Sequence, residues 1–162
     1  FILSSLSLYT ATDDLIAQIL RNNKIPDTKQ AEIKNYVAMQ RKMANDILQH
    51  GSITEEIPSL TETEFKQYPI VMPLSGMFYE KDILYSWDDY REHLKQAKEY
   101  AKQHTNYKAV ENHSPAFRNI QINIREGKWV IVSKNKTPAI HFLIRHPKMR
   151  NAFENMVVPV ME

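Results

Sequence analysis

The sequence predicts an α+β protein, with N-terminal helices followed by a small, mostly antiparallel sheet that has helices packed on one face. Apolar residues recur at helical spacing over residues 28–49 and again over 87–104, which predicts two long amphipathic helices. Apolar and polar residues alternate over 120–124, as they do in a half-buried strand. The 162 residues, 43% of them hydrophobic, are enough to bury the core of one domain. The absence of cysteine excludes disulfides and thiolate metal sites.

Residues 1–51 form the predicted helical N-terminal segment. A first helix is expected from Thr12 to Asn22, because the Thr12 hydroxyl can cap it and acidic residues follow in the first turn. A second, longer helix is expected over 28–49, and Gly51 should end it.

The long second helix is also the predicted dimer interface. The helix before it is too short to cover its apolar stripe, so we expect a homodimer in which a second copy of the chain packs there. Packing against the rest of its own domain is the alternative. The predicted interface residues are Tyr36, Met39, Met43 and Ile47.

Residues 52–66 are predicted to be an acidic connector, with a short helix near its end. The stretch up to Phe65 holds four glutamates and neither lysine nor arginine. Residues 67–162 then form the predicted α+β sensor domain. Its first two strands are expected over 68–74 and 77–85, and prolines at the margins of the first mark it as a short or edge strand.

The C-terminal part of the chain predicts three more strands and a helix. The alternating strand over 120–124 leads through a turn with Gly127 into a strand over 129–132, which is apolar on both faces and should be central. A further strand is expected over 139–145. Pro147 sits where the first turn of a final helix would begin.

This C-terminal part is strongly basic. From Arg125 to Arg150 there are seven lysines and arginines and one acid, Glu126. One interpretation is a binding site for a small anionic effector, and the other is a solvated surface whose lysines protect the sheet edges. The predicted ligand-binding residues are Arg118, Lys134 and Arg145, with Trp129 and His141 nearby.

The same residues also allow two other interpretations, catalysis and metal binding. A small phosphodiesterase or hydrolase could use His141 as nucleophile beside Lys134, but a second His/Lys set to protonate the leaving group is not recognisable. A metal on His141 and His146 would need a third ligand, such as His104 or His113. Because isolated His pairs lack a fixed geometry, we expect neither a metal nor a cofactor. A protein interaction module without a ligand is a third alternative.

Several common functional classes lack their motifs. The chain has no Gly-rich phosphate loop, no HExxH, no GxSxG and no EF-hand loop, which argues against those enzyme classes. The longest apolar run is far short of the ~20 residues that span a bilayer, so no membrane partner is expected. The chain starts at Phe1, without a signal peptide, and we expect a fragment of a longer cytoplasmic protein.

Two stretches carry a resemblance to a known family. They read YPIVMPLSGMFYEKDILYSWDDYREHL (68–94) and FRNIQINIREGKWVIVSKNKTPAIHFLIRHPKM (117–149). Over roughly the last 95 residues, the chain resembles the C-terminal portion of helix-turn-helix transcriptional regulators from low-GC Gram-positive bacteria. The resemblance implies an effector-binding and dimerising domain that reaches DNA only through a DNA-binding domain upstream.

Overall fold

The computed structural model describes residues 1–3, 6–73, 75–112 and 120–161, and these form an α+β fold. The strands are β1 (Ile2–Leu3), β2 (Ile53–Pro58), β3 (Tyr107–Asn112), β4 (Ile120–Arg125), β5 (Trp129–Lys134) and β6 (Ile140–Ile144). The helices are η1 (Leu8–Thr10), α1 (Asp13–Asn22), α2 (Asp27–His50), α3 (Glu62–Gln67), α4 (Ser75–Phe78), α5 (Trp87–Gln103) and α6 (Pro147–Met161).

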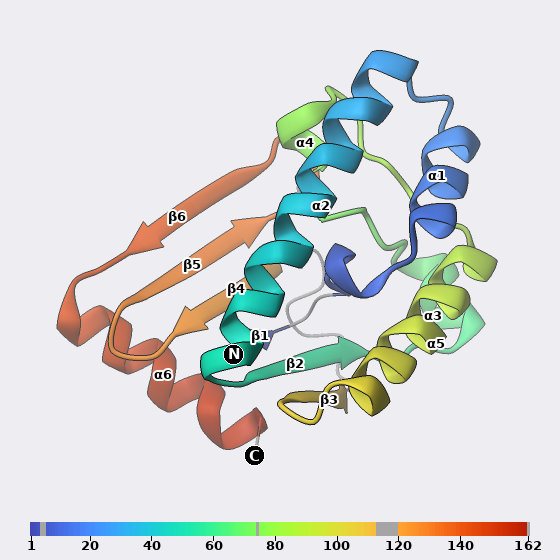
Figure 1. Cartoon of the computed structure of the whole chain (residues 1–162). Helices are drawn as coiled ribbons and strands as arrows, with labels where there is room; N and C mark the ends of the chain where they lie inside the picture. Colours follow the sequence, from blue (N-terminus) through green and yellow to red (C-terminus); the bar gives the residue numbers. More distant parts are fainter. Residues whose placement is uncertain (4–5, 74, 113–119, 162) are drawn as a thin grey trace.

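The strands form one mixed sheet in the order β3-β2-β1-β4-β5-β6 (Figure 1). The pairs β1–β2 and β2–β3 are parallel, and the three pairs from β1 to β6 are antiparallel. The short strand β1 joins the two halves, because Ile2 lies opposite Glu55 on one side and Asn123 on the other. The sheet is therefore antiparallel in three of its five pairings, and its parallel part comes from two consecutive βαβ connections.

The predicted connector over 52–66 is wrong for its first half, which is strand β2. Glu55 and Glu56 are both buried, although an acidic stretch was expected to be solvated. Ile53, Glu55 and Ile57 alternate along the strand and lie on one face of the sheet. The short helix expected at the end of this segment is confirmed as α3, with a capping box between Thr61 and Glu64.

The two strands expected over 68–74 and 77–85 are also wrong as predicted. In the described residues they are reduced to an isolated bridge between Val71 and Leu84, and helix α4 occupies the start of the second. Residue 74 lies outside the described residues. Prolines at both margins of the first stretch remove backbone donors that a longer ladder needs. Gly76 lets α4 approach the start of β6, because a Cβ at this position would lie 2.6 Å from the Ala139 Cβ.

The long helices are confirmed, and so are the N-terminal caps of α1 and α5. Helix α2 starts after Pro26 without a side-chain cap, although Asp27 or Thr28 was expected to cap it. The Thr12 hydroxyl accepts a hydrogen bond of 3.3 Å from the Leu15 amide and caps α1. Ser86 and Asp89 form a capping box at the start of α5. Strands β4, β5 and β6 and helix α6 also lie where the sequence predicts them.

Helices cover both faces of the sheet, whereas the sequence predicted helices on one face. One face carries η1, α1, α2 and α5, and Figure 1 shows α2 crossing in front of the strands. The main core lies under these helices and includes Ile16, Ile19 and Tyr90. Helix α6 lies on the other face, where Val157 packs against Ile122, Ile124 and Val130. Buried apolar clusters on both faces thus hold the sheet between its helical layers.

Candidate functional site

A pocket of about 420 Å³ opens on the helical face, where α2, α5 and the η1–α1 junction meet. We call it the Arg41 pocket. Its walls are the junction from Tyr9 to Asp13, Arg41 of α2, and four residues of α5: Gln96, Glu99, Tyr100 and Gln103. The volume lies in the range of small-molecule sites, ~300–1,000 Å³.

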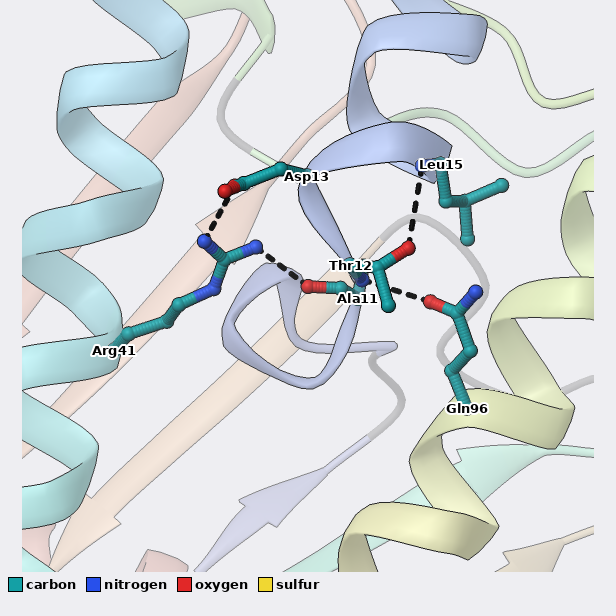
Figure 2. A network of polar contacts seen from close by, with 6 residues as sticks. All are labelled: Ala11, Thr12, Asp13, Leu15, Arg41 and Gln96. Carbon is teal, nitrogen blue, oxygen red and sulfur yellow. Dashed lines mark hydrogen bonds and ion pairs between the residues drawn. The ribbon is translucent and has the colours of Figure 1, made fainter.

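Arg41 spans the gap between α2 and the start of α1 (Figure 2). Its Nη1 lies 2.5 Å from Asp13 Oδ1, and its Nη2 donates a hydrogen bond of 2.6 Å to the carbonyl oxygen of Ala11. The Arg41 side chain is 29% exposed, whereas Asp13 is 82% exposed. An incoming anion could therefore replace the Asp13 carboxylate on the guanidinium without disturbing a buried group.

Helix α5 holds the other side of the junction (Figure 2). Gln96 Oε1 accepts a hydrogen bond of 2.8 Å from the Thr12 amide, one of the donors that the start of a helix leaves without a partner in its own ladder. Glu92 Oε1 in turn accepts a hydrogen bond of 3.0 Å from Gln96 Nε2, which fixes the orientation of the amide. The junction is thus pinned by α2 on one side and by α5 on the other.

The inner wall of the pocket rests on a buried carboxylate, Glu55 of β2. Tyr9 lines the pocket and donates a hydrogen bond of 3.1 Å to Glu55 Oε2, which also accepts one of 2.8 Å from the Tyr107 hydroxyl. Glu55 Oε1 accepts a hydrogen bond of 2.8 Å from the Ser7 amide. Tyr100 completes an aromatic cluster, with ring centroids 5.7 Å from Tyr9 and 5.0 Å from Tyr107.

Burial raises the pKa of Glu55 above its ordinary value of 4.5, although the hydrogen bonds from Ser7, Tyr107 and Tyr9 oppose that shift. The pKa values of Tyr9 and Tyr107 are also raised, first by burial and then by the nearby Glu55 charge. The tyrosines therefore stay protonated and act as donors. Glu55 is fully buried, so it positions Tyr9 and the η1 turn and does not itself face the pocket.

His93 of α5 is a second buried polar group behind the pocket. Thr10 Oγ1 donates to the Ser7 carbonyl at 2.8 Å, so it accepts from His93 Nε2 at 3.0 Å. The Tyr85 hydroxyl then donates to His93 Nδ1 at 2.9 Å. Burial lowers the pKa of His93 from 6.5 to about 4, which keeps the ring neutral. This histidine is a structural pin between α5 and η1.

The lining of the Arg41 pocket suits binding better than catalysis. It offers a guanidinium, the carboxylates of Asp13 and Glu99, and uncharged donors and acceptors such as Thr12 and Gln103. Glu55 and His93, whose pKa values are shifted, are fully buried behind it and cannot reach a bound molecule. In the described part of the chain, no three His, Asp or Glu side chains gather as they would around a metal ion.

Of the sequence-predicted ligand residues that the structure describes, none lines this pocket. Arg118 lies outside the described residues. His141 and Ser133 are opposite each other on β6 and β5, and His141 Nδ1 lies 2.9 Å from Ser133 Oγ. Lys134 follows Ser133 in the strand and so lies on the opposite face of the sheet. The sheet therefore lies between the side chains of His141 and Lys134. A hydrolase that uses this pair would need the two side chains close together, and the fold does not place them so.

The remaining predicted residues of this set lie at the end of the sheet where β5 begins and β6 ends. Trp129 is half-buried at the start of β5, on the same face as Ser133. Arg145 is exposed and directly follows β6. A role for these two residues and for His141 in ligand binding stays a prediction.

The described histidines among the candidate metal ligands are spread over different parts of the fold. His104 stacks on Tyr100 with ring centroids 4.1 Å apart, at the end of α5. His146 is exposed between β6 and α6, and His113 lies outside the described residues.

The predicted dimer-interface residues lie on an exposed flank of α2. Met39 and Met43 are each 51% exposed and Ile47 is 44% exposed. Tyr36 is half-buried, because its ring packs against Phe78 of α4 with centroids 5.0 Å apart. This flank faces away from Arg41, since Arg41 and Met43 are separated by about 200° around the helix. Self-association through it stays a prediction.

Comparison of the chain with known proteins gives no assignment. No protein family, curated protein or solved structure matches it. In the part of the chain that the structure describes, every helix is too short or too polar to cross a bilayer.

Sequence reasoning missed Arg41, Gln96 and the buried Glu55. The first two come from different helices and carry no local signal, because only the tertiary packing brings them to the same junction. Glu55 did carry a signal, since it alternates with Ile53 and Ile57 and belongs on their inward face.

Proposed function

We propose that this chain is the ligand-sensing, self-associating domain of a cytoplasmic transcriptional regulator whose DNA-binding domain lies upstream. The observation that carries the proposal is the position of Arg41. It lies in a pocket of ligand size and links α2 to the η1–α1 junction through Ala11 and Asp13. A ligand there would act on three helices at once, which is what a sensor requires.

The chemistry of the pocket favours a small zwitterion of about amino-acid size. The Arg41 guanidinium would bind a carboxylate, which is the group that it already holds in Asp13. The Asp13 carboxylate, once released from Arg41, would bind an ammonium group. Tyr100 and Glu99, which Lys102 Nζ contacts at 2.7 Å, complete the lining on the α5 side. A ligand with several negative charges fits less well, because Arg41 is the one cation of the described lining and the Asp13 carboxylate lies beside it.

Helix α2 provides a route from the pocket to a partner. A ligand that takes Asp13 off Arg41 would change how α2 is held against α1. Helix α2 in turn packs through Tyr36 on Phe78 of α4, and α4 closely approaches Ala139 at the start of β6. Differential binding to two arrangements of α2 would shift the population of the dimer state that favours operator DNA.

A thermal-shift screen tests the proposal. The probes are a panel of amino acids, small monocarboxylates and sugar phosphates, applied to the wild-type chain, Arg41→Ala and Lys42→Ala. Lys42 is the neighbouring exposed cation on α2 and does not line the pocket, so it serves as the matched control. We expect at least one amino acid to raise the Tm of the wild type and of Lys42→Ala, but not that of Arg41→Ala. A panel that shifts none of the proteins, or all three equally, would overturn the pocket assignment.

A further inference from the structure

We propose that strand β6 is the self-association surface, and that it pairs antiparallel with β6 of a second copy about a two-fold axis at Phe142. The inference rests on the proposed self-association, but it replaces the sequence-predicted flank of α2 with a different surface. It concerns an edge of the sheet remote from the Arg41 pocket, so the two proposals can fail independently.

Strand β6 is the outermost strand on its side of the sheet (Figure 1). Among the described strands it pairs with β5 alone, so one edge of its backbone has no strand beside it. Three of its apolar side chains are exposed, with Phe142 at 61%, Leu143 at 54% and Ile140 at 43%. An edge strand with large exposed apolar side chains is a template for pairing with another strand.

The strand lacks the features that protect such edges. Its sequence, Ile-His-Phe-Leu-Ile, contains no lysine, arginine, acid or proline. Its five residues pair with β5 in an unbroken register, so no bulge twists the edge away. The flanking charges and prolines, Pro138 and Arg145, lie outside the strand. A regular, uncharged and apolar edge of this kind is consistent with pairing to a strand of another molecule.

The strand is also self-complementary, which points to a second copy as that partner. Ile140, Phe142 and Ile144 share one face, and their order is symmetric about Phe142. An antiparallel pair centred there places Phe142 opposite its counterpart and Ile140 opposite Ile144 of the other copy. No like charges face each other in this register, and apolar cross-strand pairs stabilise a sheet. The interface would be isologous, as a closed dimer requires.

Neighbouring residues can extend the contact beyond one strand. A stable interface buries about 1,200–2,000 Å² in total, more than a single strand pair supplies. Met149 and Met156 of α6 are 53% and 44% exposed, and α6 covers the sheet face that carries Phe142. A two-fold axis at β6 would bring the α6 helices of the two copies to the same face of a continuous sheet.

Two measurements test the inference. The first is the mass in solution of the wild type, Phe142→Lys and Met43→Lys, by light scattering. Both residues are more than half exposed, so both variants should keep the fold, which circular dichroism and Tm would check. The second is oxidative cross-linking of Phe142→Cys and Leu143→Cys. The chain has no natural cysteine, so each introduced thiol reports one position.

We expect a wild-type dimer that Phe142→Lys dissociates and Met43→Lys leaves intact. Directly opposed residues in an antiparallel pair have Cα atoms ~4.5–5.5 Å apart, within the ~4.4–6.8 Å that a disulfide spans. Cysteine at 142 should therefore cross-link faster than cysteine at 143, which would face position 141 of the other copy. A monomeric wild type, equal cross-linking at both positions, or a dimer that only Met43→Lys dissociates would overturn the inference. The ligand should still raise the Tm of Phe142→Lys, which distinguishes a failure of the β6 surface from a failure of the Arg41 pocket.

Discussion

Arg41 Nη2 donates a hydrogen bond of 2.6 Å to the carbonyl oxygen of Ala11, and this bond joins the middle of α2 to the turn that starts α1. The same guanidinium holds Asp13 in the first turn of α1. A residue with two forked donors can make both contacts at once, whereas a lysine offers one ammonium group at a single point. Arg41 is therefore both a wall of the pocket and a strut between two helices.

The Arg41→Lys variant should lose most of the connection that Arg41 makes between α2 and the start of α1. We expect a fall in the free energy of unfolding of about 1 kcal/mol, because one charge-assisted hydrogen bond to a half-buried carbonyl is lost. Urea denaturation of Arg41→Lys, with Lys42→Ala as the control, measures the difference. A variant as stable as the control would contradict the strut.

Glu55→Ala and Glu55→Gln should differ sharply in their free energy of unfolding. Alanine leaves the Ser7 amide and the Tyr9 and Tyr107 hydroxyls without their acceptor and opens a cavity, which should cost about 3 kcal/mol or more. Glutamine can accept from the Ser7 amide and donate to a tyrosine oxygen, so it should cost much less. Urea unfolding at pH 7 compares the two variants, and equal losses would contradict the hydrogen-bonding role.

The raised pKa of Glu55 also has a consequence for pH dependence. The folded state holds this proton more tightly than the unfolded state, so the contribution of Glu55 to stability falls as pH rises from 4.5 through its folded pKa. Glu55→Gln lacks this loss. The variant should therefore gain stability relative to the wild type between pH 5 and pH 8, as urea unfolding at those two values would show. A difference that does not change with pH would count against a buried carboxyl at this position.

His93 should affect the pH dependence of stability in the direction opposite to that of Glu55. Its pKa is about 4 in the folded chain against an ordinary 6.5, so the unfolded state binds the extra proton between these values. Stability from the neutral ring is complete above pH 6.5 and is lost as pH falls toward 4, by about 3 kcal/mol. The difference in unfolding free energy between wild type and His93→Gln, measured from pH 7 to 4.5, isolates this effect because Glu55 is common to both. A constant difference would contradict the buried neutral histidine.

Gly76→Ala should destabilise the chain, because its new Cβ would lie 2.6 Å from the Ala139 Cβ. Helix α4 or the start of β6 must then shift, and we expect a cost of about 1–3 kcal/mol from overpacking. Gly51→Ala is the matched control, since its Cβ would meet the Ile47 carbonyl oxygen at an ordinary 3.5 Å. Thermal unfolding of both variants compares them, and equal Tm values would show that α4 does not need its close approach.

Local features of the fold were predictable from the sequence, and distant ones were not. The caps at Thr12 and Ser86 and the alternation in β4 depend on residues close in sequence, and the structure confirms them. Strand β1 has only two residues, too few for a periodic signal, and it is recognised only through its pairing with β2 and β4.

The predictions that proved wrong also have physical causes. The acidic composition of 52–66 predicted a solvated connector, although Ile53 and Ile57 alternate as they do in a strand. The inward Glu55 is tolerated in this strand because Tyr9 and Tyr107, from distant parts of the chain, donate hydrogen bonds to it. Lys134 and His141 looked like a pair in the sequence, but alternation along β5 and β6 places them on different faces of the sheet.

The most direct test of the ligand-sensing proposal is a calorimetric titration. The amino acid that gives the largest thermal shift is titrated into the wild type, Arg41→Ala and Lys42→Ala. The account predicts that Arg41→Ala weakens binding about tenfold or more, because a guanidinium–carboxylate contact contributes ~1.5–3 kcal/mol, while Lys42→Ala binds as the wild type does. Equal affinity of Arg41→Ala and the wild type would contradict the assignment of the Arg41 pocket.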